Sequence, residues 1–278
     1  MFKSDVVKDR TDMRHMTWKK GRESSGTTGT LLKSSFTDKE GTKHYYKLSD
    51  YSVTEGIIGH ECVNELVCSR LLTILGVDYL SYRLLHALIS VDGKEFDTWI
   101  AESLDFKKPG QSKMALDDYY EMNMFPEETP FDFCVRMGWQ EEICQMLVVD
   151  YLILNRDRHG ANIEVLKNSA GEHMLAPLFD HGLSLVYDCR TERAAAAFDV
   201  LDDWPVQSFF GGHSAEKNLQ FIKKENIPSL RSPEKRDKEV LFKGLSGILP
   251  DIYYEKMWEM IEKRWRHYDR FIKDLRNS

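Results

Sequence analysis

The chain has 278 residues, of which 42% are hydrophobic and 30% are charged, and its formal net charge is −7 at neutral pH. This length and composition predict one large globular domain or two lobes, and they exclude disordered, collagen-like and low-complexity chains. An acidic chain has no general electrostatic footprint for nucleic acid, so we do not expect DNA or RNA as a direct ligand.

The sequence predicts a cytoplasmic protein without a membrane span. The mean hydropathy is −0.47, and the longest apolar run, residues 146–154, is short and contains Asp150. Aspartates at positions 5, 9 and 12 argue against a secretory signal. The five cysteines are an odd number without paired or metal-binding spacing, so we expect reduced thiols.

The first hundred residues are predicted to form strands around one helix. A helix is expected at residues 59–75, where apolar residues recur at helical spacing before Gly76, a residue suited to a helix C-terminus. Turns are expected at residues 38–41 and 92–93. Four segments have the composition of strands: residues 31–36, 44–48, 81–90 and 95–101.

The character of the sequence changes after about residue 105. Residues 107–110 have the composition of a linker, and most of the following chain is predicted to be helical. Residues 139–154 are expected to form a largely buried helix, and residues 162–166 and 173–178 a short hairpin. The pattern indicates an α+β fold with a β-rich lobe at residues 1–105 and an α-rich lobe at residues 106–278.

The C-terminal segment carries a wide aromatic stripe at helical spacing. We expect this amphipathic helix to pack onto its own domain rather than onto a partner. The residues of the stripe are Trp258, Ile261, Trp265, Tyr268, Ile272 and Leu275.

The densest polar sequence follows the predicted buried helix. Residues 150–166 read DYLILNRDRHGANIEVL, and residues 176–184 read APLFDHGLS. A buried helix that ends in a dense polar loop is costly unless the polar groups have partners or a chemical role. Asp157 and Asn162 are five residues apart, and Asp180 follows Asp157 by 23 residues.

This arrangement suits phosphoryl transfer, although each residue alone is also an ordinary turn or cap residue. The reaction needs a carboxylate that accepts the proton of an attacking hydroxyl, and oxygen ligands for Mg²⁺ on the nucleotide phosphates. Asp157 fits the first role, and Asn162 and Asp180 fit the second. Protein kinases also place an Asn five residues after the catalytic Asp, followed by a metal-binding Asp-x-Gly. We expect His159 to brace the loop.

The N-terminal part would then hold the phosphates. Residues 24–30, SSGTTGT, form a loop whose glycines allow backbone N–H groups to converge on an anion, although a surface hairpin would look similar. Lys47 is the candidate phosphate lysine and Glu65 its acidic partner. Lys33 and Glu61 remain the alternatives for these two roles.

With these motifs in place, the sequence resembles the HipA-like kinases, bacterial serine/threonine kinases distantly related to phosphoinositide kinases. The resemblance spans roughly residues 24–184. Its most specific parts are residues 150–159 with Asn162, and residues 176–180. Weaker matches are Ser25-Gly26, Asn64-Glu65-Leu66, Leu71, Leu75-Gly76, residues 102–105 and Ser184.

The resemblance implies a two-lobed protein-kinase-like fold and an ATP-dependent serine/threonine protein kinase that transfers the γ-phosphate of Mg-ATP to a protein hydroxyl. Asp157 would be the catalytic base, and Asn162 and Asp180 the Mg²⁺ ligands. Ser24 and Ser25 would be candidates for regulatory phosphorylation. The residues expected at the cofactor are Ser25, Gly26, Thr27, Lys47, Glu65, the backbone of Glu102, Ser103 and Leu104, and His159.

The expected partners are ATP, a protein substrate with a Ser/Thr acceptor and an antitoxin-like regulator. Only about 20 residues precede the glycine loop, so we expect no contact through the extra N-terminal subdomain of HipA toxins. Residues 204–214 are expected to form either a substrate-docking loop or an ordinary surface loop.

Three rival functions remain. A two-metal phosphoesterase would use Asp157 with His159 and Asp180 with His181, and His173 and His213 are the only nearby candidates for further ligands. A pseudokinase would keep the nucleotide-binding fold without the reaction. A phosphoinositide-type lipid kinase shares the Asp-Arg-His-x-x-Asn block, but the acidic net charge disfavours an anionic membrane substrate.

Overall fold

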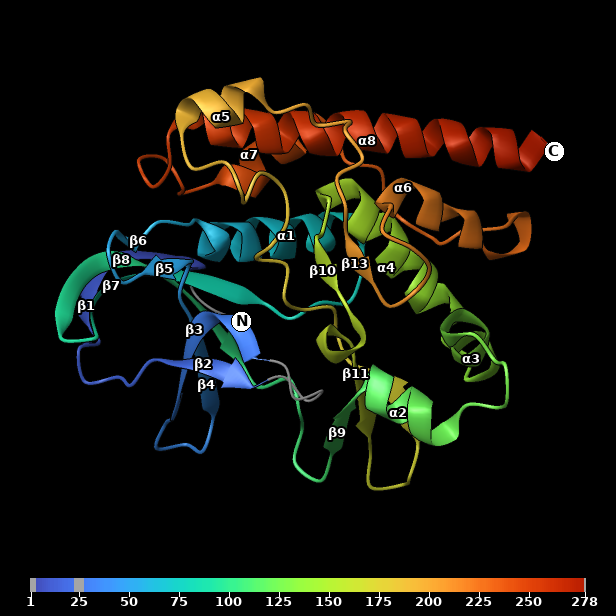
Figure 1. Cartoon of the computed structure of the whole chain (residues 1–278), viewed down its shortest axis with the longest axis horizontal. Coiled ribbons are helices and arrows are strands. Elements are labelled where there is room, and N and C mark those ends of the chain that lie inside the picture. The colour runs from blue at the N-terminus through green and yellow to red at the C-terminus, as the bar shows by residue number, and fades with distance from the viewer. Residues whose placement is uncertain (1–3, 23–27, 278) are drawn as a thin grey trace.

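The computed structural model describes residues 4–22 and 28–277. Within these residues, six strands form a sheet of order β1-β7-β8-β4-β3-β2 at one end of the molecule (Figure 1). Only the β1–β7 pair is parallel. The strands are β1 (Val6–Asp12), β2 (Lys19–Arg22), β3 (Thr28–Thr37), β4 (Lys43–Lys47), β7 (Tyr82–Val91) and β8 (Lys94–Leu104).

The four predicted strands of this region are present as β3, β4, β7 and β8. The predicted turn between β7 and β8 consists of Asp92 and Gly93, both with positive φ, which is the geometry of a two-residue hairpin turn. Strands β1 and β2 lie at the two edges of the sheet and were not predicted. Both sequences are largely polar, and most of β1 is exposed, so neither carries an apolar alternation. A small hairpin joins β5 (Tyr51–Ser52) to β6 (Gly56–Ile57).

Helix α1 (Glu61–Leu75) confirms the predicted helix and is buried on almost all sides, with only Thr73 exposed. It ends at Gly76, whose φ is +79° and whose N–H donates to the carbonyl of Leu72. A helix buried on nearly all sides is typical of a core position, and its buried polar residues therefore need partners. One side contacts β7 and β8, and another contacts α7 (Asp237–Phe242), where Arg70 donates to the carbonyl of Leu241.

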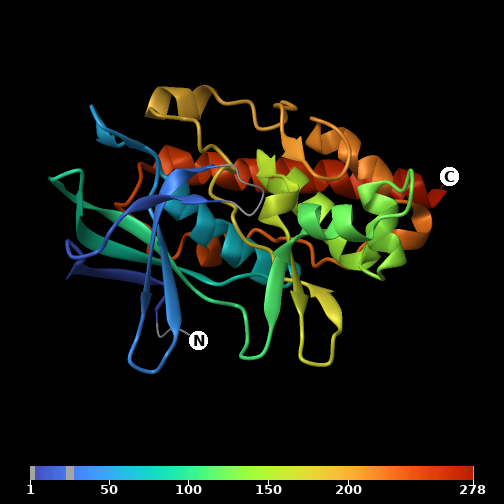
Figure 2. The same ribbon diagram turned by 60° about the horizontal axis from the view of Figure 1, so that its bottom comes forward.

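The remainder of the chain is mostly helical. Helix α4 (Gln140–Ile153) confirms the predicted buried helix. Residues 107–110 connect β8 to β9 (Ser112–Ala115), which was not predicted and pairs with β11 (Glu164–Lys167). Strand β11 also pairs with β12 (His173–Leu175) as the predicted hairpin, except that Asn162 lies in a 3₁₀ turn before it. Figure 2 shows these strands on the same side of the molecule as β3 and β4.

The other elements of this part surround α4 and the hairpin. They are α2 (Leu116–Asn123), α3 (Pro130–Arg136), β10 (Asp157–Arg158), the 3₁₀ turn η1 (Gly160–Asn162), α5 (Glu192–Ala197), β13 (Gln207–Ser208), α6 (Ala215–Asn218), the 3₁₀ turns η2 (Leu219–Phe221) and η3 (Lys224–Asn226), and α8 (Asp251–Asn277). None of the helices in the described chain combines the length and apolar character needed to cross a membrane. All five cysteines are free and buried.

Helix α8 runs across the length of the molecule, along α5, α7 and α4 (Figure 1). The predicted aromatic stripe packs on the core: Trp258, Ile261, Tyr268 and Ile272 are buried. Trp265 and Leu275 are partly buried against the same cluster. The stripe therefore serves the protein's own core, as expected.

Arg264 fixes α8 to two other segments. Its side chain is 1% exposed and donates to the carbonyls of Tyr151 in α4, and of Val200 and Asp202 in the loop after α5. Burying a guanidinium is costly unless its N–H groups have acceptors. The three carbonyls supply those acceptors and also bind the loop to the helix.

We predict that Arg264→Leu lowers the free energy of unfolding by about 3 kcal/mol, because three buried carbonyls lose a charged donor. The matched control is Arg266→Leu on the same helix. The Arg266 side chain is 65% exposed and makes a surface ion pair with Glu262, so this change should cost less than about 0.5 kcal/mol. Chemical denaturation of both variants measures the difference, and equal costs would contradict the anchoring role of Arg264.

Candidate active site

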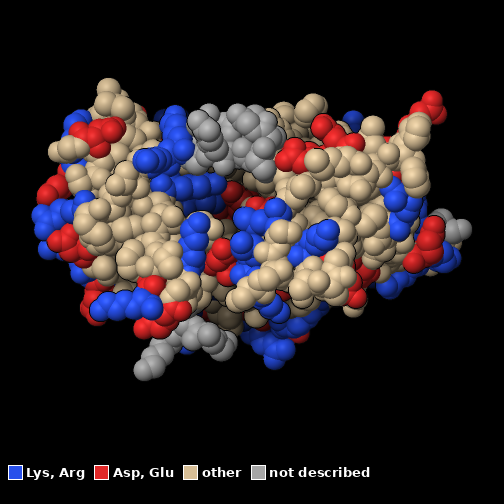
Figure 3. Space-filling model, turned by 90° about the horizontal axis from the view of Figure 1, so that it is seen from below, with Lys and Arg blue, Asp and Glu red and all other residues tan. Residues whose placement is uncertain are grey.

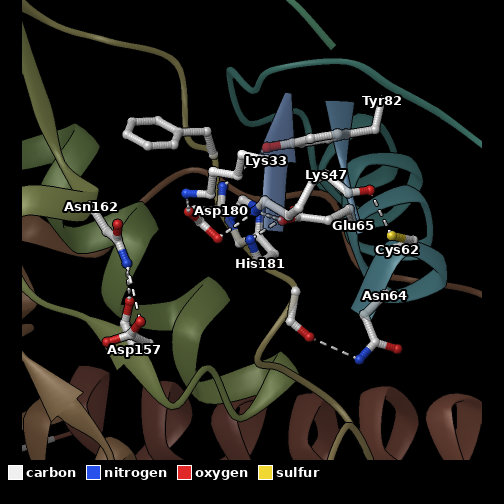
Figure 4. A network of polar contacts seen from close by, with 12 residues as sticks. Lys33, Lys47, Cys62, Asn64, Glu65, Tyr82, Asp157, Asn162, Asp180 and His181 are labelled. Carbon is white, nitrogen blue, oxygen red and sulfur yellow. Dashed lines mark hydrogen bonds and ion pairs between the residues drawn. The ribbon is translucent and has the colours of Figure 1, made fainter. Parts of the chain in front are cut away.

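Three charged side chains from distant parts of the chain meet at the end of β4. Lys47 is 8% exposed, and its Nζ donates to Glu65 of α1 and to Asp180 Oδ1, the latter at 2.6 Å (Figure 4). Glu65 is fully buried. Lys47 and Glu65 thus form the pair that the sequence favoured over Lys33 and Glu61, and Asp180 joins them from the loop after β12.

Burial and the neighbouring charges shift the pKa values of all three groups in this cluster. Burial alone would lower the pKa of Lys47, but the carboxylates of Asp180 and Glu65 raise it well above its ordinary value. Burial tends to raise the pKa of Asp180, and the ammonium groups of Lys47 and Lys33 outweigh that effect and lower it. For Glu65 burial dominates, and its pKa is raised. Lys47 is therefore protonated and Asp180 ionised at neutral pH.

One turn of α1 holds the loop that carries Asp180. Glu65 Oε2 accepts from the backbone N–H of His181 at 2.8 Å. Asn64 Nδ2 donates to the carbonyls of Gly182 at 3.0 Å and Ser184 at 2.9 Å. The role of Asn64 was not predicted, although it stands in the matching Asn-Glu-Leu motif. Because adjacent residues of one helix bind both the lysine and the loop, α1 sets their relative positions.

The backbone of the Asp-His-Gly sequence is constrained at both Asp180 and Gly182. Asp180 has a φ of +59°, and its N–H donates to the hydroxyl of Tyr82 at 3.3 Å. A Cβ atom at Gly182 would lie 3.2 Å from Glu61 Cβ and 3.3 Å from Glu65 Oε1, so the close approach to α1 favours glycine. Tyr82, on β7, was not predicted as a site residue.

The predicted catalytic loop is organised by a buried arginine. Arg158 is 2% exposed, pairs with Asp150 at the end of α4, and donates to the carbonyls of Asn162 and Phe179. The second of these bonds joins the loop to the residue before Asp180. Arg158 and Asp150 stand in the matched sequence block, but their supporting role became visible only in the structure.

Asp157 and Asn162 contact each other in this loop. Asn162 Nδ2 donates to the backbone carbonyl of Asp157 at 2.8 Å and to its carboxylate at 3.4 Å. The amide oxygen of Asn162 therefore points away from Asp157 (Figure 4). His159 Nε2 lies 3.4 Å from Asp157 Oδ1, in a position to brace the carboxylate. The Asp157 side chain remains 27% exposed, which leaves it accessible to an incoming group.

The oxygen atoms of Asp180 and Asn162 suit a hard divalent cation. Mg²⁺ in such sites takes one or two protein carboxylates and completes its shell with phosphate and water oxygens. Residues 4–22 and 28–277 contain no group of three or more His, Cys, Asp or Glu side chains placed to hold a metal. The further ligands that a phosphoesterase would need lie elsewhere, since His173 packs against Tyr119 and His213 contacts the carbonyl of Val206.

A pocket of about 260 Å³ opens beside Asp180, between the sheet and the hairpin strands. Phe106 and Phe179 line one part of it, with ring centres 5.8 Å apart. Lysines 33, 47 and 113 also line it, and Figure 3 shows basic side chains around the hollow and acidic atoms within it. Flat apolar surfaces next to cationic groups suit a ligand with an aromatic ring and phosphates.

The segment predicted to hold adenine lies at the same pocket. Ser103 and Leu104 line it, whereas the side chain of Glu102 is buried against His44 and Arg83. Ser103 pairs with Tyr82, at the first residue of β7, so Leu104 lies beyond the end of that strand. In an antiparallel sheet, the N–H and C=O groups of successive residues point alternately to the two neighbouring strands. Those of Asp105 point to β4, where its N–H donates to the carbonyl of Lys43, so those of Leu104 point to the β7 side, past the first residue of that strand. The predicted loop residues Ser25, Gly26 and Thr27, and Ser24, lie outside the described residues.

Similarity to known proteins is found in the structure and not in the sequence. No family model matches the sequence, and no curated protein matches it significantly. The chain is similar to the crystal structure of a proinflammatory kinase, CtkA, from Helicobacter pylori, with a TM-score of 0.61 and 14% identity over 91% of this chain and 93% of that one.

Two further structures match with lower TM-scores. One is HipA of Shewanella oneidensis MR-1, in a complex with HipB and operator DNA, at 0.48, with 13% identity over 90% of this chain and 66% of that one. The other is the Golgi casein kinase at 0.47, with 15% identity over 95% and 73%. The likeness to CtkA confirms the predicted fold class, an α+β, two-lobed, protein-kinase-like fold.

We predict that Lys47→Met destabilises the protein by roughly 3–5 kcal/mol, because it leaves the buried Glu65 and Asp180 without their shared cation. Adding Glu65→Gln to this variant should restore part of the loss, since one buried negative charge is removed. The exposed Lys20 provides the control, and Lys20→Met should leave the stability nearly unchanged. Chemical denaturation of these three variants measures the differences in stability. A Lys47→Met single variant as stable as the unmodified protein would contradict the prediction.

Proposed function

We propose that the protein is an ATP-dependent serine/threonine protein kinase of the HipA-like type. The observation that carries the proposal is the contact of Lys47 with both Glu65 of α1 and Asp180 of the loop after β12. Kinases require a lysine–glutamate pair and a metal-binding aspartate to be in place together. In this proposal, residues 1–105 form the nucleotide-covering lobe and residues 106–278 the lobe with the catalytic loop.

The pocket provides the proposed nucleotide site. Phe106, Phe179 and the backbone at Leu104 would hold the adenine, and Lys47 would hold phosphate oxygens. Asp180 and the amide oxygen of Asn162 would hold Mg²⁺, which when bound neutralises charge on the phosphates. CtkA, whose fold is similar, is a kinase, and this supports the proposed use of the site.

Asp157 is the proposed base for the acceptor. Its carboxylate would orient a serine or threonine hydroxyl and receive its proton, while Asn162 and His159 keep it in position. Strand β13 pairs with β10, so the segment around Gln207 passes directly beside Asp157 (Figure 1). This proximity favours the docking interpretation of residues 204–214 and a polypeptide as the acceptor. A regulator that resembles an antitoxin remains a proposal from the sequence.

The function can be tested with labelled ATP and Mg²⁺, followed by mass spectrometry of the protein, of an added cell lysate and of added phosphoinositide vesicles. We expect phosphate on serine or threonine of a protein, including the chain itself. Nucleotide binding without transfer would indicate a pseudokinase, and label in lipid alone a lipid kinase. Either result would contradict the proposed activity.

We predict that Asp157→Asn and Asp180→Asn each reduce phosphate transfer by roughly 100-fold or more, because one removes the base and the other a charged metal ligand. Asp269→Asn is the matched control, since the Asp269 side chain is 49% exposed on α8 and pairs with Lys273, away from the proposed site. Steady-state rates and melting temperatures measured together separate lost chemistry from lost folding. Transfer near the unmodified rate in either site variant would refute the role assigned to that residue.

A further inference from the structure

A row of lysines crosses three strands of the sheet next to the candidate active site. Lys33 of β3 stands directly opposite Lys47 of β4, and Lys19 of β2 stands opposite Lys33. Directly opposite residues share one face of a sheet, and like charges at such positions are destabilising. The carboxylates of Glu65 and Asp180 relieve part of this repulsion, and a further anion on this face would relieve more of it.

The three lysines that line the pocket differ in how well their charge is already balanced. Lys47 is bound by two carboxylates, and Lys113 pairs with Glu164 at 2.9 Å. Lys33 Nζ lies 3.5 Å from Asp180 Oδ2, on a carboxylate whose other oxygen already accepts from Lys47 at 2.6 Å. Its side chain is 37% exposed. By the ion pairs among residues 4–22 and 28–277, Lys33 has a weaker counter-charge than Lys47 or Lys113.

The position of Lys33 allows its ammonium group to reach a ligand in the pocket. Its ammonium group lies beside Asp180 and next to Lys47 (Figure 4), and all three residues line the pocket. A long and partly exposed lysine side chain moves its ammonium group at little cost. Phosphate oxygens placed beside Lys47 would lie within reach of Lys33, and a charge-assisted hydrogen bond to them is stronger than a 3.5 Å contact with a shared carboxylate.

We propose that Lys33 is a second phosphate-binding residue, which exchanges its contact with Asp180 for the phosphates of a bound nucleotide. This inference rests on the proposed function, because the phosphates are those of ATP. It assigns to Lys33 a role in addition to that of Lys47, whereas the sequence treated the two lysines as alternatives. Lys33 leaves Asp180 free for other contacts when the nucleotide is bound.

Calorimetric titration of the full chain with ATP and with adenosine tests the proposal. Lys33→Gln should weaken ATP binding by roughly tenfold or more, the usual value of a hydrogen bond to a charged group, and leave adenosine binding unchanged. Lys33→Arg should retain most of the ATP affinity. The control Lys20→Gln removes an exposed lysine opposite Leu32, at the neighbouring position of the same strand pair, and should bind both ligands normally.

The outcomes separate this inference from the function on which it rests. ATP affinity unchanged in Lys33→Gln, while the unmodified protein binds ATP, would overturn the role of Lys33 alone. An equal loss of ATP and adenosine affinity would show a structural effect and would also overturn it. Failure of the unmodified protein to bind ATP would overturn the proposed function together with this inference.

Discussion

The structure depends on one buried ion cluster, in which Lys47 is shared by Glu65 and Asp180. Removing charged groups from water is costly, and a cluster of this kind often stabilises a fold no more than apolar residues would. Its value here is positional, because it joins a strand of the sheet, a helix and a loop of the helical part at one point. A lysine that balances two carboxylates holds all three elements in a single arrangement.

Helix α1 makes that arrangement rigid. It is packed between the sheet and α7. Its residues Asn64 and Glu65 hold the loop of Asp180 by hydrogen bonds to the backbone of His181, Gly182 and Ser184. Arg158 fixes the loop of Asp157 and Asn162 to the same segment through the carbonyl of Phe179. The groups expected to touch the reacting atoms, Asp157 and Lys33, are partly exposed. A fixed interior thus carries the accessible side chains of Asp157 and Lys33.

The sequence predicted the parts of the fold that have strong local signals. The periodicity before Gly76 and the apolar run before Asn155 located α1 and α4, and the polar blocks located Asp157, Asn162 and Asp180. Strands β1 and β9 were missed because short, exposed strands carry little apolar pattern. The position of Lys33 directly opposite Lys47 was also missed, since it follows from the register of β3 on β4. Tyr82 carries no motif, and only folding places its hydroxyl at Asp180.

The central claim is that Lys47, Asp180 and Asn162 surround the phosphates of a nucleotide. A crystal structure with Mg²⁺ and a non-hydrolysable ATP analogue tests it most directly. The account predicts phosphate oxygens on Lys47, a cation bound by Asp180 and Asn162, and the adenine ring in the pocket against Phe106 and Phe179. A nucleotide bound at another surface, with the Lys47 cluster unchanged, would contradict the account.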